Sequence, residues 1–262
     1  MKSKPISKKR CTSLNLMVAL GICLIATSPR MWAESTVYNT TLGETNPVTP
    51  EIDTEQLKKI LADRSGPVLD VRFAQEYAIA HISESINIYE KEIETVKQRF
   101  PDKATPIVLY CNGPFCGKSK RVSSELLKLG YSNVKRYQLG LPIWRALGNT
   151  VQTDLAGLQY MVGGDKTAVF VDARSRGEFE QGSVPGAVNI LAGEAEQANE
   201  PTDGRLPHKD KGTRVIVFAT DPKDARKVAE EIAKKAYWNG SYFGGTTDEL
   251  KTKGFWQQKK PK

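Results

Sequence analysis

A repeated pattern is the sequence feature that most constrains the fold of this chain. Five short blocks occur twice in the same order, and the second occurrence follows the first by 102 to 108 residues. The pairs are Asp70-Val71-Arg72 with Asp172-Ala173-Arg174, Glu76-Tyr77 with Glu178-Phe179, Ile86-Asn87-Ile88 with Val188-Asn189-Ile190, Val108-Leu109-Tyr110-Cys111 with Ile216-Val217-Phe218-Ala219, and Leu139-Gly140 with Gly244-Gly245. The pattern predicts two copies of one domain of about 100 residues. We place the copies at residues 52–150 and 154–257.

Each copy alternates short apolar strands with amphipathic helices. In the first copy we expect strands at 67–70, 107–110 and 134–137, and helices at 54–62 and 119–129. In the second we expect strands at 169–171 and 215–218 and a helix at 223–235. This order is typical of an α/β fold in which helices flank a mainly parallel sheet. Residues 148–154 are expected to be a linker, and 193–212 a long surface loop.

Residues 1–33 have the organisation of an export signal. A basic segment at 2–10 precedes an apolar run at 14–25, which is shorter than the roughly 20 residues that span a bilayer. We expect cleavage after Ala33 and a mature protein in the bacterial periplasm or outside the cell, with no stable membrane insertion after signal removal. An uncleaved membrane anchor is less favoured. Lipidation at Cys23 is also less favoured, because Ile22 stands where a small residue is expected.

The net charge of +8 arises mainly from this leader. It holds six of the 38 basic residues and no acidic residue, so the remainder carries 32 basic and 30 acidic groups. A nearly neutral body offers no electrostatic surface for nucleic acid, and that class of partner is excluded.

The four cysteines fall into two groups. Cys11 and Cys23 lie in the leader, so the expected mature chain keeps Cys111 and Cys116. Two cysteines in a body of this length do not form a disulfide framework. Their position in one loop, directly after a predicted strand, indicates chemistry. A buried cysteine without a function is the alternative.

Taken together, the blocks resemble the rhodanese family of sulfurtransferases over residues 52–256. The first copy carries Leu69-Asp70-Val71-Arg72, Glu76-Tyr77, His81-Ile82, Ile86-Asn87-Ile88, Val108-Leu109-Tyr110-Cys111, Leu129-Gly130-Tyr131 and Gly140-Leu141-Pro142-Ile143-Trp144. In the second copy, residues 182–190 are similar to the family's GHIPGA-x-NI signature, with Ser183 in place of histidine. The resemblance implies two tandem rhodanese-like domains, each a mainly parallel sheet flanked by helices. It also implies sulfur transfer without a metal or an organic cofactor.

The resemblance further implies that Cys111 is the catalytic nucleophile, which takes a sulfane sulfur from a donor and passes it to cyanide or a thiol. The expected anion-binding loop between strand and helix consists of Asn112, Gly113, Pro114, Phe115, Cys116, Gly117, Lys118 and Ser119. Backbone amides at the start of a helix, with a nearby lysine, lower the pKa of a thiol and bind anions.

The loop departs from the usual family pattern, in which an Arg-Ser pair follows the cysteine more closely than Lys118-Ser119 does here. Cys116, with Arg121 five positions after it, is therefore a competing nucleophile. We favour Cys111, because a count from Cys116 leaves the next helix too short. Cys116 keeps three further possible roles: a resolving thiol, a disulfide partner or a packing residue. Gly117 stands where a cysteine phosphatase needs arginine, which argues against that activity.

Asp70 and Arg72 are expected to support the site from a neighbouring strand end. Arg72 either binds an anionic donor or forms an ion pair that fixes the loop. We favour the ion pair, because the second copy keeps both residues without a cysteine. His81 is interpreted as structural rather than as a catalytic base.

The second copy is predicted to be inactive. Ala219 stands at the position of the cysteine, and Asp221 and Asp224 follow it. Their negative charges would repel a thiolate and an anionic donor.

Two functions follow from the sequence. The first is an exported sulfurtransferase that moves sulfane sulfur from a thiosulfate- or polysulfide-like donor to a thiophilic acceptor through a Cys111 persulfide. Its expected partner is a small sulfur-containing anion or a protein persulfide. The alternative is a non-catalytic binding module or a thiol–disulfide redox module that uses Cys111 and Cys116.

Overall fold

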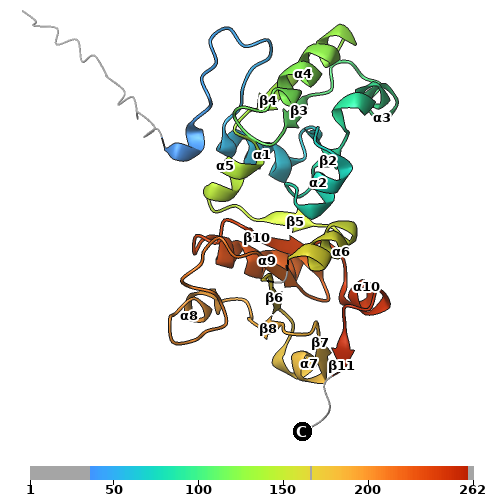
Figure 1. The fold of residues 1–262 in the computed structure, drawn as a ribbon. Coiled ribbons are helices and arrows are strands. Elements are labelled where there is room, and N and C mark those ends of the chain that lie inside the picture. The colour runs from blue at the N-terminus through green and yellow to red at the C-terminus, as the bar shows by residue number, and fades with distance from the viewer. Residues whose placement is uncertain (1–35, 166, 259–262) are drawn as a thin grey trace, which may run out of the picture. The chain divides into compact units, whose positions relative to one another are not determined.

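The first half of the chain forms a four-stranded parallel sheet (Figure 1). The computed structural model describes residues 36–165 and 167–258, so the leader and its expected signal lie outside the described residues. The strands are β1 (Val68–Asp70), β2 (Ile86–Asn87), β3 (Ile107–Tyr110) and β4 (Val134–Tyr137). They lie in the order β2-β1-β3-β4, and each neighbouring pair is parallel.

Helices surround this sheet. They are η1 (Val37–Asn39), α1 (Thr54–Asp63), α2 (Ala74–Ile79), η2 (Glu90–Thr95), α3 (Val96–Arg99), α4 (Lys118–Lys128) and α5 (Gly140–Ala146). Helix α1 begins where a capping box forms: the Gln56 amide donates to Asp53 Oδ1 at 2.7 Å, and the Asp53 amide donates to Gln56 Oε1 at 3.0 Å. The strands and helices predicted for this copy are present, and no end shifts by more than one residue.

The second half forms a five-stranded sheet. Its strands are β5 (Val151–Thr153), β6 (Val169–Asp172), β8 (Val188–Asn189), β9 (Val215–Phe218) and β10 (Gly240–Phe243). They lie in the order β5-β10-β9-β6-β8, again all parallel. The helices are α6 (Leu155–Gly164), α7 (Arg176–Gln181), α8 (Ala195–Ala198), α9 (Pro222–Ala233) and α10 (Thr247–Thr252). The short strands β7 (Gly182–Ser183) and β11 (Gln257–Gln258) form an antiparallel pair.

The two sheets repeat one topology. The order β2-β1-β3-β4 in the first half corresponds to β8-β6-β9-β10 in the second. The repeat blocks lie on equivalent strands: Asp70 ends β1 and Asp172 ends β6, while Tyr110 ends β3 and Phe218 ends β9. The predicted α/β fold, two tandem domains with parallel sheets flanked by helices, is confirmed.

The prediction of a linker at residues 148–154 is wrong in part, because this segment contains β5. This strand pairs in parallel with β10 at the edge of the second sheet. The first sheet has a shorter equivalent, in which Glu51 forms a parallel bridge with Arg136 of β4. Each domain therefore begins with an edge segment ahead of its first helix. Strand β1 is equally short but was recognised by its apolar run, whereas Val151-Gln152-Thr153 has a single apolar residue and gives no such signal.

The prediction of a surface loop at residues 193–212 is also wrong in part. It contains the short helix α8, and Ala195, Ala198 and Leu206 are buried in the core of the second domain. Arg205 holds the segment by binding Asp203 and Glu194. Only the polar residues of this segment gave a signal in the sequence, while its small apolar residues carried the packing.

Apolar side chains cover both faces of the first sheet. Val108 and Leu109 are neighbours in β3 but belong to different buried clusters, because successive side chains of a strand point to opposite faces. Leu57 of α1 packs in the cluster of Val108, and Leu126 of α4 packs in the cluster of Leu109. Helices α1 and α4 therefore cover opposite faces of the sheet, and α4 covers the face that Cys111 shares.

The two domains pack against each other within one compact unit. Helices α2 and α6 approach so closely that a Cβ atom on Gly157 would lie 2.0 Å from the carbonyl oxygen of Ala78. Ile79 of α2 packs against the cores of both domains. Within the described residues, no helix is both long and apolar enough to cross a membrane.

Candidate active site

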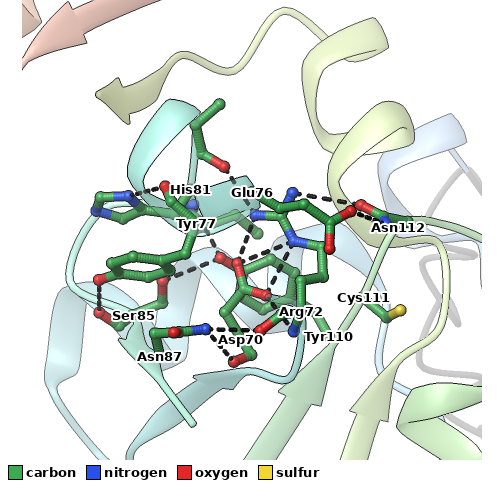
Figure 2. Close-up of polar contacts among 12 residues, drawn as sticks. Asp70, Arg72, Glu76, Tyr77, His81, Ser85, Asn87, Tyr110, Cys111 and Asn112 are labelled. Atoms are coloured by element: carbon green, nitrogen blue, oxygen red, sulfur yellow. Dashed lines mark hydrogen bonds and ion pairs between the residues drawn. The ribbon is translucent and has the colours of Figure 1, made fainter. Parts of the chain in front are cut away.

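Cys111 lies directly after β3, a strand with a neighbour on each side. The residue is 2% exposed and packs with Val122 and Leu126 of α4. Helix α4 begins at Lys118, so Cys111 opens a loop that leads from a strand end to a helix start. Figure 2 shows Cys111 beside Asn112, at the edge of a network of polar side chains.

A disulfide bond joins Cys111 to Cys116, and their Cα atoms are 6.3 Å apart. A turn brings the two residues together: the Cys116 amide donates to the carbonyl oxygen of Gly113 at 3.0 Å. Gly113 has a φ of 132°, which favours glycine. Phe115 lies at the tip of the turn and is fully exposed. Of the roles left open for Cys116, the structure shows the disulfide partner.

Gln138 fixes the loop through hydrogen bonds of its side chain, and the sequence analysis did not identify this residue. Its Nε2 donates to the carbonyl oxygens of Pro114 and Cys116, at 3.0 and 3.3 Å. Its Oε1 accepts from Ser119 Oγ at 2.9 Å and from Arg136 Nη1 at 2.7 Å. Gln138 follows β4 directly and is 2% exposed. Its only signal in the sequence was its position directly after a predicted strand.

A close backbone contact fixes the start of the loop. The Leu141 amide donates to the carbonyl oxygen of Cys111 at 3.1 Å. Gly140 has a φ of 67°, and a Cβ atom there would lie 2.5 Å from the Gly113 amide nitrogen and 2.6 Å from the Cys111 oxygen. Glycine at position 140 is therefore required by the close backbone approach at the loop that follows Cys111.

A buried ion pair lies beside the loop (Figure 2). Arg72 Nη2 is 2.5 Å from Asp70 Oδ2, and the side chains are 4% and 0% exposed. Arg72 also donates to the carbonyl oxygen of Ala80 at 2.7 Å and to Asn112 Oδ1 at 3.3 Å. Burial lowers the pKa of Arg72, but its bonds to Asp70 and the charge of Asp70 outweigh burial and raise it. The ion-pair role that we favoured for Arg72 is present.

Glu76 forms an ion pair with Lys118. Asn112 Nδ2 donates to Glu76 Oε1 at 2.6 Å, and Lys118 Nζ lies 3.8 Å from Glu76 Oε2. Lys118 also lies over the Phe73 ring, 4.2 Å from its centroid. Burial raises the pKa of Glu76, but hydrogen bonds from Asn112 and Phe73 and the charges of Lys118 and Arg72 outweigh burial and lower it. The expected charge of Lys118 in the loop is thus partly neutralised.

The start of α4 is open to an anion. Its first residues have no side-chain cap. In the part of the chain that the structure describes, the amides of Gly117, Lys118 and Ser119 have no acceptor. Uncapped amides at a helix start attract negative charge. Arg121, one turn further on, is paired with Glu90.

The second domain lacks these features at the matching place. Ala219 follows β9 and is buried, and α9 starts only three residues later at Pro222. Asp221 caps this helix, because its Oδ1 accepts from the Lys223 amide at 2.8 Å. The negative charge expected at this helix start is therefore in place as a cap, and the position of the thiol holds a methyl group.

His81 has structural contacts. Its Nδ1 lies 2.9 Å from the carbonyl oxygen of Tyr77, and the two rings stack with centroids 3.7 Å apart. Its backbone exchanges two hydrogen bonds with Gln152 of β5. Trp144 is buried and donates to the carbonyl oxygen of Thr150 at 2.9 Å. Among the described residues, no three His, Cys, Asp or Glu side chains converge as metal ligands would.

In a comparison with known protein families, one domain family matches this chain at two places. The rhodanese-like domain matches residues 53–147 and again residues 156–249. The thiosulfate:glutathione sulfurtransferase of Saccharomyces cerevisiae is 31% identical over 112 residues, which are 36% of this chain and 76% of that protein. The thiosulfate sulfurtransferase PspE of Escherichia coli is 36% identical over 69 residues, which are 26% of this chain and 64% of that protein.

Among solved structures, a thiosulfate sulfurtransferase from Pseudomonas aeruginosa is similar with 22% sequence identity and a TM-score of 0.35. The similarity covers 79% of this chain and 43% of that chain. The chain therefore spans less than half of that enzyme and less than two thirds of the E. coli relative.

Proposed function

This chain belongs to the rhodanese-like domain family, with two copies in tandem, and we propose that it is an exported sulfurtransferase that works through a persulfide on Cys111. One observation carries the proposal: a cysteine at the end of a central strand faces a loop that ends in an uncapped helix start. The matching loop of the second domain has neither feature. The names of the yeast and E. coli relatives support thiosulfate as the donor.

The proposed reaction has two nucleophilic steps. The Cys111 thiolate attacks the outer sulfur of thiosulfate, a new S–S bond forms, and sulfite leaves with the electron pair of the broken bond. Cyanide or a thiolate then attacks the outer sulfur of the persulfide, which restores the Cys111 thiolate and gives thiocyanate or an acceptor persulfide. The amides of Gly117, Lys118 and Ser119 stabilise the anionic persulfide.

The disulfide has to open before this cycle begins. Cys111 is buried, whereas Cys116 is partly exposed. We therefore assign Cys116 as the sulfur that an external thiol attacks. The Cys111 thiolate is then the leaving group, and a second thiol frees Cys116 from the mixed disulfide.

The disulfide also favours a second candidate function, a thiol–disulfide redox module. In that case the pair exchanges with partner thiols and no sulfur is transferred. We further propose that residues 1–33 direct export to the periplasm or beyond and are removed, and that 52–150 is the active domain and 154–257 the inactive one.

The test is thiocyanate formation from thiosulfate and cyanide by the reduced protein. Wild type is expected to turn over, and Cys111→Ala is expected to be inactive at the same degree of folding. A reduced wild-type protein that makes no thiocyanate but re-forms its disulfide reversibly would favour the redox module instead.

A further inference from the structure

A pocket of about 340 Å³ adjoins the catalytic loop. Part of its wall is formed by Asn112, the residue after Cys111, and by Arg72 and Glu76. Figure 2 shows these three residues within the polar network. The rest of its wall consists of Ile79, Ala80, Leu141, Pro142, Arg145 and Trp238. The wall therefore combines a polar end at Asn112, the residue next to Cys111 in the chain, with an apolar side that includes an exposed indole.

Arg145 of α5 is the unusual member of this wall. Its Nε and Nη2 atoms are buried without a hydrogen-bond partner. Within residues 36–165 and 167–258, its guanidinium forms no ion pair and lies over no aromatic ring. Burial, with repulsion from Arg214 and Arg72, lowers the pKa of Arg145 to about 10, so it remains charged at neutral pH. A buried cation without a counter-ion is costly, and an anion in the pocket would remove that cost.

The other charges of the pocket are already compensated. Arg72 is paired with Asp70, and Glu76 is bound by Asn112 and lies near Lys118. Arg214, which repels Arg145, is paired with Asp165 at 3.2 Å. Among the described residues that line the pocket, Arg145 is therefore the one whose charge has no partner.

We propose that Arg145 binds the carboxylate of a small thiol, whose sulfur accepts the persulfide sulfur from Cys111. The apolar wall formed by Leu141, Pro142 and Trp238 fits the carbon chain of such a thiol, which an inorganic anion lacks. The thiolate attacks the outer sulfur of the Cys111 persulfide. A new S–S bond forms on the acceptor, and the electron pair of the broken bond stays on Cys111. This inference rests on the proposed function for its reaction, while the binding site stands on the pocket alone.

The kinetic test compares two acceptors that differ in one group. Protein carrying persulfide from thiosulfate is mixed with 3-mercaptopropionate or with 2-mercaptoethanol, and the loss of the added sulfur is followed by intact mass. In Arg145→Gln the preference for the carboxylate over the neutral thiol should fall by about tenfold or more, the size of a charge-assisted hydrogen bond. Arg145→Lys should keep part of it, and the matched control Lys59→Gln, at an exposed lysine of α1, should keep all of it.

A binding test separates this inference from the proposed function. The unreactive analogue 3-(methylthio)propionate should change the fluorescence of Trp238 in a saturable way, and Trp238→Phe should remove that change. Arg145→Gln should weaken the binding by about tenfold or more. Equal binding by wild type and Arg145→Gln would overturn the inference, as would an equal acceptor preference. If wild type never gains sulfur, the proposed function fails while the binding test still decides the site.

Discussion

The guanidinium groups of Arg72 and Arg174 share two contacts, each made at the equivalent place in its own domain. Each Nη2 binds the aspartate two residues earlier, at 2.5 Å to Asp70 and 2.6 Å to Asp172. Each also donates at 2.7 Å to a carbonyl oxygen eight residues later. The ion pair is thus a part of the fold that both domains need, whether or not a cysteine stands nearby.

Asp70→Ala is expected to destabilise the protein strongly, because it leaves the buried Arg72 charge without an anion. The expected loss in the free energy of unfolding is about 3 to 5 kcal/mol, measured by urea denaturation. Asp172→Ala should cost a similar amount through Arg174. A loss below about 1 kcal/mol in both variants would place the pair among weak surface ion pairs and contradict this account.

Gly140→Ala is expected to impair the catalytic loop. The added Cβ atom would meet the Gly113 nitrogen at 2.5 Å, so the loop or α5 has to move. The control is Gly130→Ala, which has a φ of 90° but no atom within 4 Å of the added Cβ. The control should lose about 1 to 2 kcal/mol of stability from backbone strain and keep its sulfur-transfer rate. Equal rates in both variants would show that the contact does not shape the loop.

Gln138→Leu is expected to loosen the loop, because it removes the donor to two loop carbonyls and the acceptor of Ser119. We expect a loss of about 1 to 3 kcal/mol in stability and a slower gain of sulfur from thiosulfate. The matched control is Gln152→Leu, which removes a glutamine bound to Tyr242 in the other domain. That variant should lose stability without a matching loss in the rate of sulfur transfer.

His81 makes stability depend on pH in a defined window. Burial lowers the pKa of His81 below its usual 6.5, outweighing the nearby Asp154 charge and Tyr77 carbonyl. In the unfolded chain His81 therefore binds a proton near pH 6.5, whereas in the folded chain it binds that proton only at a lower pH. Stability should fall as pH drops below about 6.5, by at most about 1.4 kcal/mol per pH unit. Melting temperatures at pH 7.5 and 5.5 check this, and His81→Gln should show a smaller decrease than wild type.

The repeat made most of the fold predictable. Blocks such as Asp70-Val71-Arg72 recur because two domains need the same strand ends, so the alternation of strands and helices could be predicted in both copies. The parts that were missed have little local pattern. Strand β5 is held by hydrogen bonds to β10, far along the chain, and Leu206 is buried by a fold that its polar neighbours do not indicate.

The site was predictable where it lies in one stretch of sequence or, as with Asp70 and Arg72, in a block that the second copy repeats. Cys111 and the loop to Ser119 are contiguous, whereas Gln138, which follows β4, and Arg145 of α5 come near the loop only in the folded chain. No spacing rule connects them to the cysteine. The role of Cys116 stayed open, because the distance between two sulfurs in a loop depends on the backbone turn at Gly113.

The central claim, a persulfide on Cys111, is tested most directly by intact mass spectrometry of the reduced protein after thiosulfate, with and without cyanide. Wild type and Cys116→Ala are expected to gain the mass of one sulfur atom and to lose it to cyanide, while Cys111→Ala gains nothing. A gain in Cys111→Ala that disappears in Cys116→Ala would make Cys116 the nucleophile. A wild-type protein that gains no sulfur and only re-forms its disulfide would contradict the account.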